Sequence, residues 1–165
     1  MAQITLKGNP VNTCGNLPEI GSAAPDFCLV ASDLSEANLA TYAGKKKVIS
    51  AFPSVDTPTC ALSVKAFTAK AASIENVVVL NVSQDLPFAQ SRFCAAEGVE
   101  NAVTLSAFRS SFGQDYGLEI SDSVLKGLCS RAIIILDENN KVIYSEQVSE
   151  IADEPNYETA LAVLG

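Results

Sequence analysis

A buried strand, a proline-rich turn and a helix follow one another within residues 48–70, and this segment constrains the fold more than any other. Residues 48–52 form an apolar run typical of a buried strand, whereas residues 61–70 have the apolar spacing of a helix. The turn between them ends at Cys60. Cys60 is therefore expected in the first turn of a helix at the carboxyl end of a strand, where open α/β sheets commonly place their sites.

This position predicts a reactive thiol. The first turn of a helix exposes backbone N–H groups and the positive end of the helix dipole, and both stabilise an anion such as a thiolate. Because the thiolate is the nucleophilic form of cysteine, we expect Cys60 to act as a nucleophile. The alternative is an inert cysteine, since a free cysteine often behaves as a small core residue.

Composition excludes several classes of protein. The chain has 165 residues, enough to bury a core, and we expect a single domain over residues 1–165. It has no histidine, which excludes Ser-His-Asp and Cys-His catalysis and histidine-containing metal sites. The five cysteines are not clustered, so we expect no metal ion and no cofactor. A net charge of -8 argues against nucleic acid or an anionic membrane as a partner.

The sequence also favours a cytoplasmic location. No apolar run approaches the roughly 20 residues that a membrane span needs, so no membrane association is expected. The amino-terminal residues lack the long apolar core of a signal peptide. In the cytoplasm, cysteines stay mostly reduced. The only basic run, Lys45-Lys46-Lys47, is interpreted as a solvated turn before a strand.

Strand and helix patterns alternate along the chain and predict an α/β fold with a central mixed β-sheet flanked by helices. Strands are expected at residues 26–31, 48–52, 76–83 and 101–105, with hairpins at residues 3–14 and 131–144. Helices are expected at residues 61–70, 87–98, 108–116 and 157–164, and residues 34–43 as a short strand or helical turn. Cys28 is expected in the core, and Cys14 is interpreted as structural or incidental.

Several segments carry a family resemblance. Pro53-x-x-x-Thr57-x-x-Cys60 resembles the active-site pattern of the peroxiredoxins, which have the thioredoxin fold. The run Asp-Leu-Pro-Phe-Ala-Gln-Ser-Arg-Phe-Cys at residues 85–94, Leu-Lys-Gly-Leu at residues 125–128 and the late Arg131 resemble the bacterial thiol peroxidase subgroup. That subgroup comprises atypical two-cysteine peroxiredoxins, and the resemblance covers essentially the whole chain. It implies a thioredoxin-like fold with an amino-terminal hairpin.

The resemblance assigns catalytic roles that the chemistry supports. Cys60 supplies the peroxidatic thiolate, and Arg131 is a permanent cation suited to stabilise the thiolate and the transition state. Thr57 hydrogen-bonds the sulfur or the peroxide, and Pro53 shields the pocket. One such donor is typically worth roughly 3 kcal/mol in the transition state. The structural alternatives are a proline that ends the strand, a threonine that caps the helix and an arginine in an ion pair.

The family also implies a resolving cysteine, here Cys94, which forms the intramolecular disulfide Cys60-Cys94. Cys94 is expected to be partly packed, so both segments would unwind locally before the disulfide forms. The alternative is a core cysteine. Cys129, two residues from Arg131, stands where an alanine-like residue is expected, and it leaves open a second candidate for the resolving thiol.

The expected substrates are alkyl hydroperoxides, reduced at least as well as hydrogen peroxide, because Phe52, Leu86 and Phe88 are placed to line the pocket mouth. The resemblance further implies thioredoxin as the reductant and a homodimer formed beside the active site. Two alternatives use the same cysteine: a redox sensor, and a thioredoxin-type oxidoreductase. The second lacks its motif, since Cys60-Ala61-Leu62-Ser63 has no second cysteine.

Overall fold

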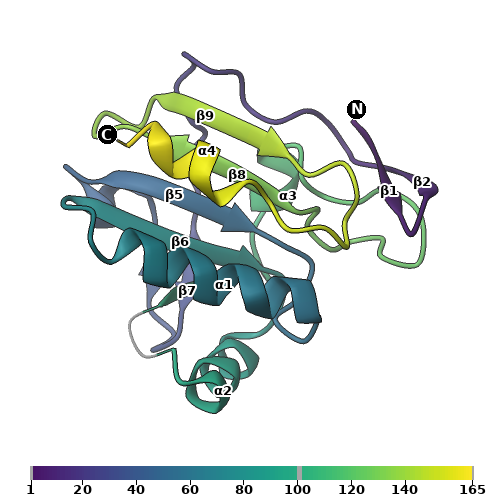
Figure 1. Cartoon of the computed structure of the whole chain (residues 1–165), viewed down its shortest axis with the longest axis horizontal. Coiled ribbons are helices and arrows are strands. Elements are labelled where there is room, and N and C mark those ends of the chain that lie inside the picture. The colour runs from purple at the N-terminus through teal and green to yellow at the C-terminus, as the bar shows by residue number, and fades with distance from the viewer. Residues whose placement is uncertain (1, 100–101, 165) are drawn as a thin grey trace.

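The computed structural model describes residues 2–99 and 102–164, and within them a mixed sheet of seven strands forms the centre of the molecule (Figure 1). The strands are β1 (Gln3–Leu6), β2 (Asn9–Asn12), β3 (Leu29–Ala31), β4 (Glu36–Ala37), β5 (Lys46–Ala51), β6 (Val77–Ser83), β7 (Val103–Ser106), β8 (Ala132–Leu136) and β9 (Val142–Gln147). The helices are α1 (Pro58–Ala71), α2 (Pro87–Glu97), α3 (Phe112–Asp115) and α4 (Tyr157–Ala162), with a 3-10 helix at Leu39–Tyr42. The strand order in the main sheet is β4-β3-β7-β6-β5-β8-β9, and β1 and β2 form a separate hairpin.

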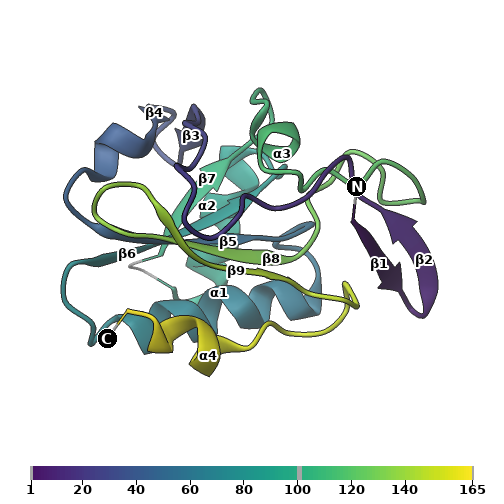
Figure 2. The same cartoon turned by 90° about the horizontal axis from the view of Figure 1, so that it is seen from above.

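Helices α1 and α4 cover one face of the sheet (Figure 2). Successive side chains of a strand point to opposite faces, so Val48 and Ile49 of β5 enter different clusters. Val48 packs with Phe67 of α1 and Ala160 of α4, whereas Ile49 faces the opposite side. The centre of the sheet is thus buried on both sides, which explains why β6 and the central part of β5 are mainly apolar.

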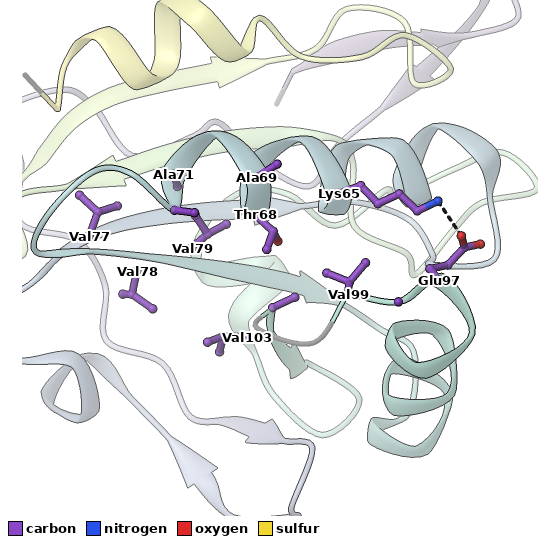
Figure 3. A pocket seen from close by; sticks show the side chains of 13 residues that line it. Lys65, Thr68, Ala69, Ala71, Val77, Val78, Val79, Glu97, Val99 and Val103 are labelled. Atoms are coloured by element: carbon purple, nitrogen blue, oxygen red, sulfur yellow. Dashed lines mark ion pairs between the residues drawn. The ribbon is translucent and has the colours of Figure 1, made fainter.

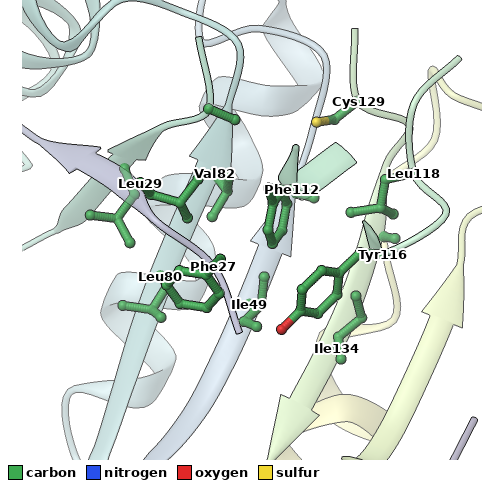
Figure 4. Packing of buried hydrophobic residues seen from close by; sticks show 14 of the residues in the cluster. Phe27, Leu29, Ile49, Leu80, Val82, Phe112, Tyr116, Leu118, Cys129 and Ile134 are labelled. Atoms are coloured by element: carbon green, nitrogen blue, oxygen red, sulfur yellow. The ribbon is translucent and has the colours of Figure 1, made fainter. Parts of the chain in front are cut away.

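The opposite face is covered by the segment around β3 and by α3. Phe27 meets Phe112 edge to face, with ring centroids 5.9 Å apart, and Tyr116 packs beside Phe112 (Figure 4). The Tyr116 hydroxyl donates to the carbonyl of Pro25 at 2.6 Å, so its polar end is satisfied inside this core. These contacts hold the segment before β3 against the sheet.

The topology brings three chain segments to one edge of the sheet. Strands β5 and β6 are parallel, so the residues that follow Ala51 and Ser83 lie at the same edge. Strand β8 runs antiparallel to β5, and Ala51 pairs with Ala132. Arg131, immediately before β8, therefore lies beside the turn that leads from β5 to α1.

The expected α/β fold with a mixed sheet and an amino-terminal hairpin is confirmed, and most of the expected elements are present. The helix expected at residues 108–116 is shorter, because the Ser110 hydroxyl accepts the Phe112 N–H and favours a turn. The strand expected at residues 26–31 begins only at Leu29. Asn101, at the start of another expected strand, lies outside the described residues.

Two expectations about single side chains are wrong. Cys28 is exposed, because it lies just before β3 with its thiol 3.0 Å from a carboxylate oxygen of Glu36. Lys47 lies inside β5 and is fully buried instead of solvated. Its ammonium donates to the carbonyl of Lys45 at 3.0 Å and to Asn140 Oδ1 at 2.7 Å, and these acceptors replace water.

No helix in the described part of the chain combines the length and the hydropathy that a membrane crossing requires. Over the same residues, no group of three or more cysteine, aspartate or glutamate side chains is arranged to hold a metal ion.

Candidate active site

Cys60 is the third residue of α1, at the carboxyl end of β5. The helix begins at Pro58, whose ring suits the first helical position because it lacks an N–H that would have no partner there. Cys60 is fully buried, in a cluster with Phe52 and Val64. Its thiol thus lies where the first-turn N–H groups and the helix dipole favour negative charge.

Arg131 lies against this thiol. Its Nη2 is 3.2 Å from Cys60 Sγ, and the side chain is 2 % exposed. Its Nε donates to the carbonyl of Ile151 at 2.9 Å, which fixes the plane of the guanidinium group. Ile151 is held in turn by its N–H bond to the carbonyl of Thr5 at 2.9 Å, so the amino-terminal hairpin supports the arginine.

The charge on Arg131 is available to an anion. Among the residues that the structure describes, no carboxylate forms a salt bridge with it. Its Nη1 is buried and has no hydrogen-bond partner in the described protein. A permanent cation in a desolvated site strongly favours a nearby anion, and the Cys60 sulfur is the group in contact. The free Nη1 is a donor that a bound oxygen atom can use.

The other two residues of the motif lie in the same turn. Thr57 occupies the N-cap position of α1, but its side chain makes no capping hydrogen bond and instead donates to the carbonyl of Ser54 at 3.1 Å. The capping interpretation of Thr57 is therefore not what the structure shows. Pro53 is buried immediately after β5, between the strand and the turn. The structure thus brings Pro53, Thr57, Cys60 and Arg131 together at one edge of the sheet.

Cys94 lies on α2, close to the same apolar cluster. It is half-buried and packs against the group that contains Cys60, Phe93 and Val99. Burial raises the pKa of the Cys94 thiol. All five cysteines are free, so the structure represents the dithiol form. The expectation that Cys94 is partly packed is confirmed.

Cys129 belongs to a different part of the core. It packs with Leu118 and Phe112 on the face opposite α1 (Figure 4). It is fully buried, and burial raises the pKa of its thiol to about 12. A buried, protonated thiol is a poor nucleophile, which weighs against Cys129 as the resolving cysteine.

Sequence reasoning missed Asp85, which follows β6. Its carboxylate accepts hydrogen bonds from the Ser54 hydroxyl at 2.7 Å and from the Val55 N–H at 2.9 Å. Both donors belong to the turn that leads to Cys60. The sequence feature that could have revealed Asp85 is its place just after a strand. Because β5 and β6 are parallel neighbours, the residues that follow them lie at the same edge of the sheet.

The three residues expected at the pocket mouth lie in different environments. Phe52 is fully buried beside Cys60, whereas Leu86 and Phe88 are 50 % and 67 % exposed near the start of α2. A cavity of about 380 Å³ beside the Cys60 turn is lined instead by Val55, Asp56, Thr57, Pro58, Ala61, Arg92, Phe93, Ala96 and Glu97.

A second cavity, of about 580 Å³, lies between α1, β6 and the segment after α2 (Figure 3). Its walls are mainly valine and alanine, and the ion pair between Lys65 and Glu97, at 2.6 Å, lies at its edge. Neither Cys60 nor Arg131 lines it, so it is separate from the site.

Comparison with known proteins agrees with this geometry. Residues 19–161 match the model of the Redoxin family. The thiol peroxidases of Mycobacterium bovis and Mycobacterium tuberculosis strain H37Rv are each 54% identical over 165 residues, which cover 100% of this chain and 99% of the relative.

Solved structures show the same fold. A peroxiredoxin-like protein from Aquifex aeolicus superposes with a TM-score of 0.94 at 38% identity, covering 99% of this chain and 96% of that one. The thiol peroxidase from Chromobacterium violaceum gives a TM-score of 0.91 at 25% identity, covering 98% and 94%.

The chain therefore belongs to the redoxin family and has the peroxiredoxin fold. Within that family it is an enzyme of the thiol peroxidase type. The expected family and the expected class of enzyme are both confirmed.

Proposed function

We propose that this peroxidase reduces hydroperoxides at Cys60 and regenerates the thiol through a disulfide with Cys94. The observation that carries the proposal is the 3.2 Å contact between Cys60 Sγ and a buried Arg131 that has no carboxylate partner in the described chain. It supplies the two things that attack on a peroxide requires: a stabilised thiolate and donors for the oxygen that becomes negative.

In the first step the Cys60 thiolate attacks the terminal oxygen of the hydroperoxide. The S–O bond forms as the O–O bond breaks, which gives a sulfenic acid and an alkoxide that takes a proton to become the alcohol. Arg131 holds the sulfur through Nη2, and its free Nη1 is available to the peroxide oxygens. Thr57 adds a hydroxyl in the same turn, and the buried Pro53 keeps water from the sulfur.

In the second step the Cys94 thiolate attacks the sulfenic sulfur, so that a disulfide forms and hydroxide leaves as water. The packing of both cysteines around one apolar cluster supports this pairing. A disulfide needs Cα atoms within about 7 Å, and the two thiols lie on different helices. The proposal includes local unwinding of the first turn of α1 and of the part of α2 around Cys94, which frees the two thiols to reach this geometry.

Thioredoxin is the reductant we propose for this disulfide, and the cytoplasm is the proposed compartment, because a disulfide that is reduced in each cycle requires a reducing environment. We further propose that the chain acts as one domain, with alkyl hydroperoxides and hydrogen peroxide as substrates. Apolar side chains around the site, among them the buried Phe52, suit an alkyl group.

A homodimer is the proposed assembly. Leu86, Phe88 and Phe108 are large apolar side chains that remain exposed beside the site. Their segments adjoin, because the Ser106 hydroxyl donates to the carbonyl of Asp85. Exposed apolar residues that lie close together indicate an interaction surface. Because the family resemblance implies a homodimer, we propose that a second copy of this chain binds there.

The test is peroxide turnover coupled to thioredoxin, thioredoxin reductase and NADPH. Cys60→Ser should abolish peroxide reduction. Cys94→Ser should consume about one equivalent of peroxide per chain and then stop, because the sulfenic acid has no internal partner. Cys129→Ser is the matched control and should turn over at the native rate. Full turnover by Cys94→Ser would contradict the proposed resolving step.

A further inference from the structure

The Asp85 carboxylate lies between the segment that carries Cys60 and the segment that carries Cys94 and hydrogen-bonds the first of them. Asp85 Oδ1 accepts from the Ser54 hydroxyl at 2.7 Å, and its Oδ2 accepts from the Val55 N–H at 2.9 Å and from the Ser83 hydroxyl at 2.6 Å. Asp85 directly precedes Leu86, the N-cap residue of α2. Three donors around one charged acceptor form a strong clamp, because hydrogen bonds to ionised groups are stronger than neutral ones.

The hydrogen bonds continue into α2. The Ser83 hydroxyl gives its proton to Asp85 and accepts from Gln90 Nε2 at 3.1 Å. The same amide nitrogen donates to the carbonyl of Leu105 in β7 at 3.0 Å. Gln90 is fully buried and lies four residues before Cys94, so both lie on one side of the helix. The network therefore reaches from the Cys60 turn to the helix of Cys94.

In the turn itself, the N–H groups of Val55 and Asp56 donate to side-chain oxygens instead of to backbone carbonyls. Residues 53–56 lie outside any helix or strand, and the Val55 N–H depends on Asp85 for its partner. The Ser54 hydroxyl, which gives its proton to Asp85, also accepts the N–H of Asp56 at 3.1 Å. Removing the carboxylate leaves two hydroxyl protons and one N–H without their acceptor. Ser54 and Val55 then lose their hydrogen bonds to the segment after β6, whereas the Phe52 N–H keeps its bond to the carbonyl of Val82 in β6.

We propose that Asp85 is a positioning residue that holds the Cys60 turn in its folded, peroxide-reactive form, and that release of this clamp sets the rate of disulfide formation. The inference rests on the proposed roles of Cys60 and Cys94. Asp85 touches neither sulfur in the structure, so it acts through Ser54 and Val55. The sulfenic acid meets Cys94 only after the turn and the helix have unwound.

The two steps then respond in opposite directions to loss of the clamp. If the unwound form is about 1 % of the population, a tenfold shift raises it to about 9 %, while the folded form stays above about 90 %. Disulfide formation, which uses the unwound form, should speed up by about tenfold. Sulfenic acid formation, which uses the folded form, should slow by less than about twofold through this shift alone.

The experiment is rapid mixing with cumene hydroperoxide, acid quenching and intact mass spectrometry, which separates sulfenic acid from disulfide in time. Asp85→Ala should accumulate less sulfenic acid and form the disulfide about tenfold faster than the native chain. It should also form less sulfinic acid at high peroxide, because the sulfenic acid persists for a shorter time. Slower or unchanged disulfide formation would overturn the proposal.

Two further variants distinguish loss of the clamp from a general folding defect. Ser54→Ala removes one donor and should change disulfide formation in the same direction by a smaller factor; no change there overturns the clamp. Asp33→Ala is the matched control, because Asp33 accepts the N–H and the hydroxyl of Ser35 within one turn next to β3. Asp33→Ala should leave both rates unchanged.

Failure of the proposed function is distinguishable from failure of the clamp. If the native chain forms no linkage between Cys60 and Cys94, the resolving step is wrong. Hydrogen exchange over residues 53–62 of the reduced protein then decides the clamp by itself. Faster exchange in Asp85→Ala than in the native chain supports it, and unchanged exchange overturns it.

Discussion

Arg131 carries a buried positive charge whose described surroundings include a thiol and a carbonyl but no carboxylate. Inside proteins, buried charges are normally paired, because desolvation of an isolated ion is expensive. In the reaction that we propose, this positive charge faces the sulfur from which negative charge moves to the leaving oxygen.

Replacing Arg131 with methionine should slow the reaction of Cys60 with hydroperoxide by about 100-fold or more, because one oriented donor to a developing oxyanion is worth about that factor. Arg131→Lys should be intermediate, since lysine keeps the charge and loses the forked geometry. Stopped-flow competition against a peroxidase of known rate measures the effect. Arg109→Met is the control, because Arg109 is exposed and pairs with Glu36 instead of with Cys60. A loss below about threefold in Arg131→Met would contradict the assigned role.

The exposed thiols give a pH-dependent prediction. The hydrogen bond to Glu36 raises the pKa of the Cys28 thiol, with smaller contributions from desolvation and then from the Glu36 charge. Glu36→Gln removes the charge, so the pKa should fall and more thiolate should be present at neutral pH. Alkylation of Cys28 by iodoacetamide, followed by peptide mass spectrometry, should become faster, while Cys14 keeps its rate. Cys129, with a pKa of about 12 in the folded chain, should react only after unfolding.

At the scale of secondary-structure elements, α1 and the turn before it meet α2 through the apolar cluster around Cys60 and Phe93 and through two ion pairs, one from α1 and one from the turn. Lys65 pairs with Glu97 at 2.6 Å, and Arg92 with Asp56 at 3.5 Å. Both pairs are exposed, so each contributes only about 0–1 kcal/mol. The helices are therefore held mainly by apolar packing and by the Asp85 network, a combination that local unwinding can interrupt without unfolding the sheet.

Hydrogen exchange should report this unwinding. After oxidation by one equivalent of peroxide, amides in residues 57–62 and 87–98 should exchange faster than in the reduced protein, because we propose that both helix segments unwind locally to form the disulfide. Strands β5 and β8 should keep their protection and serve as the internal reference. Equal protection of both helix segments in the two redox states would contradict local unwinding.

The elements were predictable where a pattern is local. The apolar run of β6, the proline that begins α2 and the polar turn between β8 and β9 each indicate their structure within a few residues. Lys47 shows the limit, because its burial depends on Asn140, 93 residues away in sequence, which supplies an acceptor. Asp85 shows the same limit at the site, since its partners Ser54 and Val55 lie in the turn that follows β5, the parallel neighbour of β6.

At the scale of the whole molecule, the parallel pair β5–β6 and the antiparallel β8 explain why the site forms where it does. Cys60, Asp85 and Arg131 are far apart in sequence, yet each follows or precedes a central strand at one edge of the sheet. Motif and family resemblance predicted Cys60 and Arg131 there. The pairing register of β5 and β8, which places Arg131 beside Cys60, could not be predicted from the sequence.

The assembly is also a property at this scale. Phe88→Glu places a charge on the exposed apolar surface formed with Leu86 and Phe108, and it should convert the proposed homodimer to a monomer, because a buried unpaired charge is strongly unfavourable. Sedimentation velocity at several concentrations measures the change. Val124→Glu is the control, since Val124 is also exposed and lies elsewhere in the chain. A native chain that is monomeric at all concentrations would contradict the proposed assembly.

The central claim is the pairing of a Cys60 peroxidatic thiol with a Cys94 resolving thiol. The most direct measurement is intact and peptide mass spectrometry of the fully reduced protein after one equivalent of cumene hydroperoxide. We predict the loss of two hydrogens and one linked pair of peptides that contain Cys60 and Cys94. A persistent sulfenic acid on Cys60, or a linkage to Cys129, would contradict the resolving role of Cys94, and an unoxidised Cys60 would contradict the whole account.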